Sequence, residues 1–391
     1  MKYDFSTRHD RSKVGAYKYV EMQTNYPDIP ADTVPFSMAD MEFKNPPPVV
    51  EGIKNYVDRS TLGYCDATAE FRAACCDFQK RWHDWDIAPE WLLPIPGVLP
   101  GLFAVIQELT QPGDGIIYFS PVFGWFKNGA AMNERVPVPC SLLTEDRNFS
   151  INFEQFEKLA QNPANKAVIF CNPHNPTGHV WTEEELRRVA EICYENDLLL
   201  ISDEVHADLV MPGYHQIAMG ALDTKYHDNL VVCIAPSKTF NAAGMQAANL
   251  VIPNEAKRQA VYGRLCRNGL FVLTALGYES CRIAYSECDE WLKQCIAQIW
   301  ENHLALKEYV AKNMPGVKVF DLEATYLQWM DFAKVVPDHA TLAEKLHKAC
   351  VIMDQGTDFG PEGDRFERMN LACPKPILMA ALERMKKVLY E

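Results

Sequence analysis

The chain has 391 residues, 48% of them apolar and 23% charged, which is the composition of a globular protein with a large core. A formal charge of −14 argues against a nucleic acid or an anionic membrane as partner. No segment approaches the roughly 18 uncharged apolar residues of a membrane span, and no signal peptide is recognisable at the N-terminus. The 13 cysteines are scattered without a Cys-x-x-Cys pair, so we expect a reducing, cytoplasmic environment.

Along the chain, an irregular N-terminal stretch ends in three prolines at 46–48, which predict a stiff connection. Helices are expected at 49–57 and 69–85. From 97 to 251, apolar runs typical of buried strands alternate with amphipathic helices, one of which begins with the capping box Thr182-x-x-Glu185. The expected strands of this stretch are 116–119, 167–170, 198–201 and 230–234, and the expected helices are 97–109, 153–159 and 182–194. This alternation predicts an α/β fold whose mostly parallel sheet is covered on both faces.

Beyond residue 289 the pattern changes to an α+β region. A long helix at 291–314 precedes short strands at 317–320 and 326–330 and helices at 341–349 and 376–390. We therefore expect a large domain at 49–289 and a smaller domain formed by 290–391 with the N-terminal arm, 1–48.

Three polar segments stand where apolar runs end. They are Asn172-Pro173-His174-Asn175-Pro176-Thr177-Gly178, Ser202-Asp203-Glu204-Val205-His206 and Pro236-Ser237-Lys238-Thr239-Phe240-Asn241. Because ligands of open α/β sheets bind at the carboxyl ends of the strands, we expect Asn175, Asp203 and Lys238 to meet. An amine for a Schiff base and an acid opposite the pyridine nitrogen are what pyridoxal 5′-phosphate (PLP) requires. The sequence therefore predicts a PLP enzyme.

Lys238 and Asp203 are the main candidates. Lys238 follows a strand in a turn, and it must be neutral to attack an aldehyde, a state that burial beside a cation favours. Asp203 would keep the pyridine nitrogen protonated, although a turn or helix-cap aspartate is the structural alternative. Glu204 is a weaker candidate because strand alternation points it the other way.

Further cofactor contacts are expected around these two residues. The Asn175 amide and His206 could donate hydrogen bonds to the phenolic oxygen of the ring, and Phe123 could stack on it. Backbone N–H groups at the helix start that contains Val98 and Leu99 could bind the phosphate. A structural loop, a core histidine and core packing are the ordinary alternatives. No histidine pair has metal-ligand spacing, so we assign no metal, and Gly-x-Gly-x-x-Gly, Walker and Gly-x-Ser-x-Gly motifs are absent from the sequence.

At these residues the chain resembles the fold-type I PLP enzymes of the aspartate aminotransferase superfamily. It is more closely similar to the MalY/PatB group of cystathionine β-lyases, or C–S lyases. The similar segments are 36–43, 62–64, 172–181, 201–208, 235–244, 325–329 and 368–374. The resemblance implies the PLP-dependent transferase fold type I, with a mostly parallel, seven-stranded-type sheet in the large domain and a smaller α+β domain.

The resemblance also implies roles. It makes Lys238 the Schiff-base lysine, Asp203 the partner of the pyridinium and Arg368 the arginine that grips the substrate α-carboxylate, a task that suits guanidinium. Asn175 corresponds to the asparagine on the phenolic oxygen. Tyr64 matches a tyrosine that reaches the phosphate of the neighbouring subunit's cofactor, so a homodimer with active sites shared across the interface is implied.

Departures from the family pattern accompany these matches. Phe123 replaces a tyrosine common at the stacking position, which leaves stacking intact but removes the hydroxyl. Ala235 stands where many members carry a phosphate-binding serine, and Ser237 is the candidate substitute. Arg365 interrupts the usual Gly-x-Gly-Phe.

The function implied is PLP-dependent β-elimination from L-cystathionine or a related cysteine S-conjugate, giving a thiol (homocysteine from cystathionine), pyruvate and ammonia. An aminotransferase of class I/II is the alternative, since the same lysine serves both reactions. A third, non-enzymatic possibility is regulation through protein binding, for which no surface motif identifies a partner.

Overall fold

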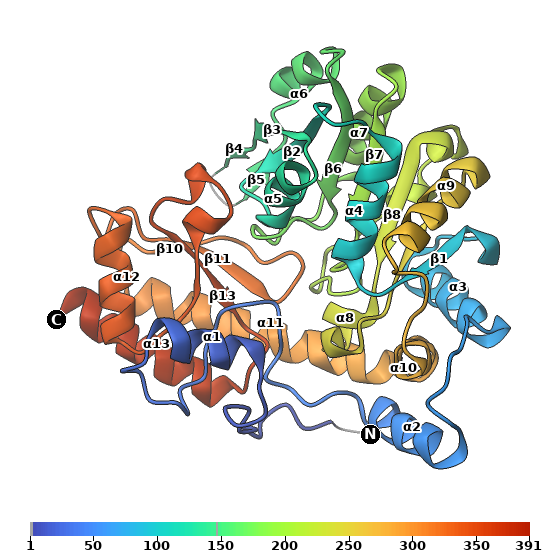
Figure 1. The fold of residues 1–391 in the computed structure, drawn as a ribbon. Helices are drawn as coiled ribbons and strands as arrows, with labels where there is room; N and C mark the ends of the chain where they lie inside the picture. The colour runs from blue at the N-terminus through green and yellow to red at the C-terminus, as the bar shows by residue number, and fades with distance from the viewer. Residues whose placement is uncertain (1–2, 146–147) are drawn as a thin grey trace.

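The computed structural model describes residues 3–145 and 148–391, which build two main sheets flanked by helices and one two-stranded hairpin (Figure 1). Within the described residues, the large sheet has seven strands, as predicted. Their order is β1 (Leu92–Ile95), β9 (Ala248–Val251), β8 (Leu230–Ile234), β7 (Leu199–Asp203), β6 (Asn165–Cys171), β2 (Gly115–Ser120) and β3 (Val136–Ser141). The strands from β8 to β3 pair in parallel, whereas β9 is antiparallel to both of its neighbours.

Both faces of the large sheet are buried, which explains why its strands read as continuous apolar runs. Ile116 and Ile201 belong to a core with α4 (Val98–Leu109), α5 (Trp125–Met132) and α9 (Glu255–Arg267). Their strand neighbours Ile117 and Leu200 face the opposite core. That core is completed by α3 (Ala69–His83), α6 (Phe153–Ala160), α7 (Glu183–Glu195) and α10 (Ala275–Glu287).

The small sheet is antiparallel throughout and lies beside the carboxyl ends of the large one. Its order is β10 (Lys318–Val319), β11 (Leu327–Asp331), β13 (Phe366–Asn370) and β12 (Asp354–Gln355). The helices α1 (Tyr17–Asn25), α11 (Asp289–Asn313), α12 (His339–Lys348) and α13 (Lys375–Tyr390) surround it (Figure 1). The remaining elements are α2 (Pro47–Arg59), the single turn α8 (Pro236–Thr239), and a hairpin of β4 (Leu143–Thr144) and β5 (Phe149–Ser150).

Several boundaries differ from the sequence-based expectation. The helix expected at 49 begins at Pro47, because prolines in a first turn lack only N–H groups that would be unpaired anyway. The helix expected to reach 85 ends at His83, since Asp84 adopts a left-handed conformation with φ of 48°. Lys238 lies in the short helix α8 rather than in a plain turn. The capping box is confirmed, with Thr182 and Glu185 bonding each other's backbone.

Short 3₁₀ turns connect several elements. They are η1 (Pro89–Trp91), η2 (Met219–Ala221), η3 (Thr224–Asn229), η4 (Ala243–Met245), η5 (Gly356–Asp358) and η6 (Pro361–Gly363). None of the helices in the described part of the chain combines the length and apolarity that crossing a bilayer requires.

Candidate active site

A cavity of about 590 Å³ lies where the carboxyl ends of β6, β7 and β8 face the small sheet. Six of the predicted site residues line it, and they come from segments far apart in the chain. These residues are Phe123, Asn175, Asp203, His206, Lys238 and Arg368. The topology therefore brings together an amine, a carboxylate, an amide, an imidazole and a guanidinium.

Lys238 presents its amine to this cavity. Nζ donates a hydrogen bond to the backbone carbonyl of Ala39, 2.9 Å away. Burial, assisted by the positive charge of Arg368, lowers the pKa of Lys238. A lowered pKa increases the fraction of neutral amine, which is the form that can attack a carbonyl carbon or accept a proton.

Asp203 ends β7 and is buried. Its Oδ1 accepts a hydrogen bond of 3.3 Å from the backbone N–H of Val205, and burial raises its pKa to about 6. The charge of Lys238 opposes this rise but does not cancel it. Because these contacts do not offset the cost of burying the charge, the Asp203 carboxylate suits a cationic N–H donor, whose positive charge would stabilise the ionised form.

Arg368 on β13 is held on several sides. Its Nε and Nη2 donate to Oδ2 of Asp354 at 3.0 and 2.6 Å, and its Nη1 donates to Oδ1 of Asn175 at 2.7 Å. The ring centroid of Phe359 lies 4.6 Å from its Cζ. Because a guanidinium has five N–H donors, one on each terminal nitrogen can still bind a carboxylate.

His206 and Phe123 complete the wall. Burial lowers the pKa of His206 well below its usual value, and the cations Lys238 and Arg368 act in the same direction, so the imidazole is neutral. Its Nδ1 is buried and has no hydrogen-bond partner among the described residues. A buried, unsatisfied nitrogen beside an amine and an under-compensated carboxylate fits a polar aromatic ring such as PLP.

Four predicted residues do not line the cavity. Val98 and Leu99 form the half-buried first turn of α4, and Ser237 is half-buried in α8. Tyr64 lies between α2 and α3 with 99% of its side chain exposed, so it makes no contribution to its own chain's cavity. Their cofactor roles stay predictions.

Asp354 is the residue that sequence reasoning missed. Besides Arg368, it binds the backbone N–H of Met38, at 3.0 Å from Oδ1 and 2.9 Å from Oδ2. It sits on the two-residue strand β12, in a stretch without hydrophobic periodicity, so no pattern marks it.

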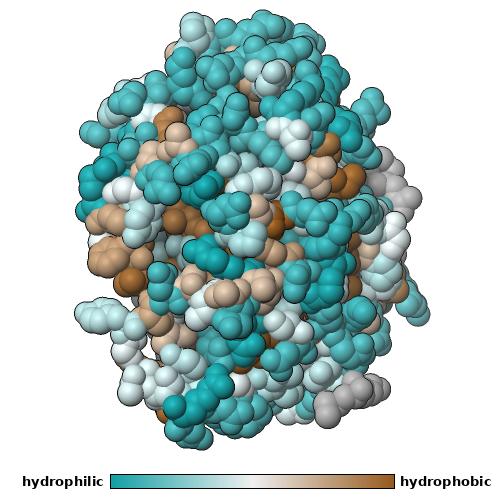
Figure 2. Space-filling view, turned by 90° about the vertical axis from the view of Figure 1, so that its right-hand side faces the viewer, coloured by the Kyte–Doolittle hydropathy of each residue, from teal (hydrophilic) through white to brown (hydrophobic). Residues whose placement is uncertain are grey.

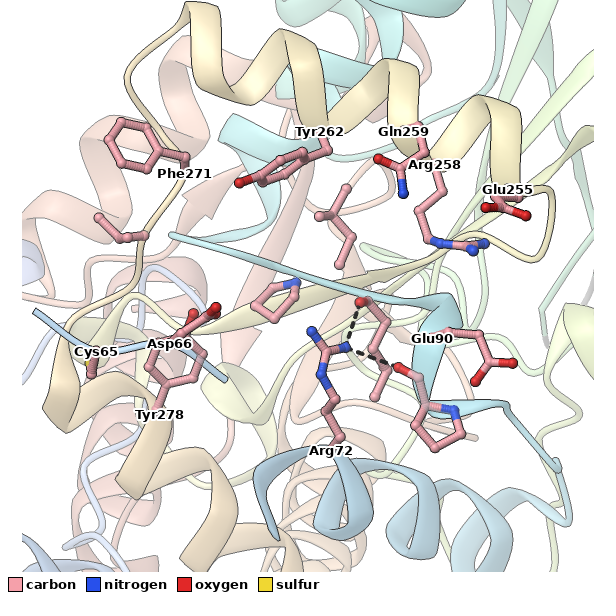
Figure 3. Close-up of a pocket in the computed structure, with 15 residues that line it drawn as sticks. Cys65, Asp66, Arg72, Glu90, Glu255, Arg258, Gln259, Tyr262, Phe271 and Tyr278 are labelled. Atoms are coloured by element: carbon pink, nitrogen blue, oxygen red, sulfur yellow. Dashed lines mark hydrogen bonds between the residues drawn. The ribbon is translucent and has the colours of Figure 1, made fainter. Parts of the chain in front are cut away.

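A larger cavity of about 790 Å³ lies elsewhere, bordered by α3, β1 and α9 (Figure 3). None of the ten predicted residues lines it. Nη1 of Arg72, in its wall, donates to the backbone carbonyls of Pro89 and Leu92, at 2.9 Å each. Without a lysine in its wall, this cavity offers no amine for a Schiff base.

The family model "Aminotransferase class I and II" matches residues 32–384. The chain belongs to this family. Among its relatives, cystathionine beta-lyase PatB from Bacillus subtilis (strain 168) is 34% identical over 359 residues, covering 92% of this chain and 93% of PatB. Protein MalY from Escherichia coli (strain K12) is 26% identical, covering 88% of each chain.

Solved structures of family members superpose over almost the whole chain. Cystalysin from Treponema denticola, whose crystal structure contains PLP, is 40% identical with a TM-score of 0.98 and covers 100% of this chain and 99% of its own. A PLP-bound C–S lyase from Staphylococcus hominis is 27% identical with a TM-score of 0.92, covering 100% of this chain and 98% of its own. The resemblance inferred from the motifs and the fold class are thereby confirmed.

Proposed function

We propose that this chain is a PLP-dependent carbon–sulfur β-lyase that releases a thiol, pyruvate and ammonia from L-cystathionine or a related cysteine S-conjugate. The observation that carries the proposal is the convergence of Lys238, Asp203 and Arg368 on one cavity. It occurs in a chain that is 34% identical to a cystathionine beta-lyase over 92% of its length.

The cofactor is PLP, and the residues of the cavity fit it. Asp203 would hold the pyridine nitrogen, Asn175 and His206 the phenolic oxygen, Phe123 a face of the ring and Lys238 the aldehyde carbon. When bound, PLP supplies an electron sink for the substrate Cα, which no protein side chain can provide. The backbone N–H groups of the first turn of α4, with Ser237, are the proposed phosphate site.

Arg368 and Lys238 act on the amino-acid substrate. Arg368 would grip the α-carboxylate with its remaining N–H donors, which orients the Cα–H bond toward the amine of Lys238. The amino group of the substrate would replace Lys238 at the aldehyde carbon, and the freed amine, whose lowered pKa increases its neutral fraction, would take the Cα proton as general base and hold it at Nζ. With the proton removed, the electron pair left at Cα would form the Cα–Cβ double bond as the Cβ–S bond breaks and the thiolate leaves. Water would then hydrolyse the remaining three-carbon product to pyruvate and ammonia.

We also propose a homodimer in which Tyr64 of the partner subunit completes the phosphate site. Its nearly full exposure supports this, as does the exposure of Leu62, Phe271 and Val272. Residues next to Tyr64 line one cavity together with Phe271 and Val272, so these side chains share one region. Figure 2 views the molecule from the side that carries α9 and α3 in Figure 1, and apolar groups are scattered over its middle.

The division into a large domain, 49–289, and a small one, 1–48 with 290–391, is likewise a proposal, supported by the separate sheets. A cytoplasmic location is proposed on the grounds given by the sequence, together with the free state of the cysteines throughout the described residues.

An aminotransferase remains the second candidate, favoured by the family's name and by aspartate aminotransferase from Pyrococcus horikoshii, 23% identical over 366 residues. Lys238 would serve both reactions, so the products must separate them.

The deciding experiment records the visible absorption of the purified protein with PLP, then adds L-cystathionine and assays pyruvate and free thiol. A cofactor band followed by both products supports the lyase. A band with amine transfer to a keto acid, and no pyruvate, supports the aminotransferase. Absence of a band even with added PLP would overturn the cofactor assignment.

A further inference from the structure

Four buried side chains form a hydrogen-bonded polar chain that begins at Thr239, the residue after Lys238. Oγ1 of Thr239 donates to Oδ2 of Asp208 at 2.5 Å, and Oδ1 of Asp208 lies 2.7 Å from Nε2 of His83. Nδ1 of His83 lies 2.9 Å from Oε1 of Gln216. All four side chains are buried, and none of them lines the cavity. The chain thus connects α3 to α8 through the segment that follows β7.

The two middle members of this polar chain, Asp208 and His83, stabilise each other. Burial alone would lower the pKa of His83, but the hydrogen bond and the charge of Asp208 outweigh burial and raise it. Both partners of the imidazole present acceptor oxygens, and an imidazolium donates from both ring nitrogens. Asp208 and His83 therefore form a buried, hydrogen-bonded pair, and removing either side chain would leave a buried polar group of the other without its partner.

Thr239, the first member of this polar chain, directly follows Lys238, so the polar chain can fix the position of the lysine. The two residues are neighbours in α8, a helix of only four residues, which is too short to be stable by itself. Phe240 anchors the end of α8 by packing against Phe78 of α3, with ring centroids 6.1 Å apart. The Thr239–Asp208 bond fixes the turn directly beside the lysine, so the direction of the Lys238 side chain depends on it.

We propose that Asp208 and His83 are positioning residues that hold Lys238, through Thr239, where its amine can reach both cofactor and substrate. The proposal rests on the proposed function only in taking Lys238 as the reacting amine. It extends that function to three residues that touch neither cofactor nor substrate, and it predicts that one buried hydroxyl controls the reaction rate.

The test compares Thr239→Val, which keeps the shape of the side chain and removes the hydroxyl, with Thr239→Ser, which keeps the hydroxyl. Thr110→Val is the matched control, because the buried Thr110 hydroxyl at the C-terminal end of α4 donates to the Ile106 carbonyl, accepts from Nε of Arg135 and has no link to Lys238. Each holoenzyme is assayed for kcat and KM with L-cystathionine, and each apoprotein for the rate at which added PLP forms its visible band.

We expect Thr239→Val to lower kcat and the rate of band formation about tenfold or more, the effect of losing a hydrogen bond to a charged group. KM should change less than about twofold, because Arg368 is untouched. Thr239→Ser should restore most of both rates, and Thr110→Val should leave them unchanged. If Thr239→Val lowers only the melting temperature and leaves both rates at the wild-type level, the chain is structural and the proposal is wrong.

A measurement on the full-length apoprotein separates failure of this proposal from failure of the proposed function. An amine-reactive reagent labels lysines, and mass spectrometry gives the labelling rate of Lys238 relative to the exposed Lys54. We expect the ratio to change about threefold or more in Thr239→Val and to be restored in Thr239→Ser. An unchanged ratio overturns the positioning role whether or not the wild type eliminates thiol.

His83→Gln tests whether His83 and Thr239 act through Asp208. If Thr239 and His83 act through the same carboxylate, the losses in kcat from Thr239→Val and His83→Gln should combine to less than their product. Fully multiplicative losses would contradict the connected chain and overturn the role of Asp208 as the link.

Discussion

The Asp203→Asn substitution should change the apoprotein and the holoenzyme in opposite directions. Asp203 is buried at the end of β7 with one backbone hydrogen bond, and burial raises its pKa from 3.8 to about 6. In the holoenzyme its negative charge would face the pyridine nitrogen, whereas in the apoprotein the same charge lacks that partner. Asparagine keeps the shape and removes the charge.

The size of the effect follows from the pKa. Below pH 3.8 the carboxyl is protonated in folded and unfolded chains, so it does not affect the free energy of unfolding. As the pH rises from about 4 to about 6, the unfolded chain ionises first and the folded apoprotein loses stability. A rise of about two units corresponds to about 3 kcal/mol at neutral pH. The substitution removes that penalty.

The assay is denaturant unfolding of the apoproteins at pH 4 and pH 8, followed by titration with PLP. Asp203→Asn should be more stable than the wild type at pH 8 by up to about 3 kcal/mol and nearly equal at pH 4, while PLP binds more weakly and stabilises it less. Asp58→Asn, an exposed carboxylate on α2, is the control and should change neither. An Asp203→Asn apoprotein no more stable than the wild type at pH 8, with unchanged PLP affinity, would refute the reasoning.

Three further substitutions test the site and its support. Lys238→Ala should abolish pyruvate release, because no other amine can take its place; turnover at the wild-type rate would disprove the assignment. Arg368→Lys should lower kcat/KM for L-cystathionine about tenfold to a hundredfold, mainly through KM, as a forked donor is replaced by a point charge; an unchanged KM would argue against carboxylate binding there. Gly363→Ala should lower the free energy of unfolding by about 1–3 kcal/mol, because its Cβ would overlap the backbone carbonyl of Gly356. Gly263→Ala on α9, where a Cβ meets only Arg267, should instead stabilise by about 0.5–1 kcal/mol in the same unfolding assay, and equal effects of the two would contradict the packing argument.

The parts of the site that local patterns encode were predictable. Asp203 and Lys238 each follow a buried apolar run, and the rule that ligands bind at the carboxyl ends of parallel strands places them together. Arg368 was assigned by family resemblance, since one arginine among many carries no local mark. The arrangement around it, with Asp354 and Asn175 as partners, depends on pairing between segments far apart in the chain.

The same limit explains two of the elements that were missed. Helix α1 lies in a stretch read as irregular because Lys18 falls on its buried side, where the periodicity requires an apolar residue. The lysine is tolerated there because Glu42 lies 2.6 Å from its amine. Strand β9 was missed because it is short and contains the buried Asn249. Such long-range compensation has no signature in the local sequence.

The positions of the site residues along the chain set the order in which they are synthesised. The ribosome releases the chain from its N-terminus, so strand β7 with Asp203 and helix α8 with Lys238 emerge before Arg368 has been made. Asp203 and Lys238, the residues proposed to bind PLP, are therefore synthesised before Arg368, the residue proposed to bind the substrate carboxylate. Recognition of the amino-acid carboxylate thus depends on β13, which is synthesised after the whole large sheet.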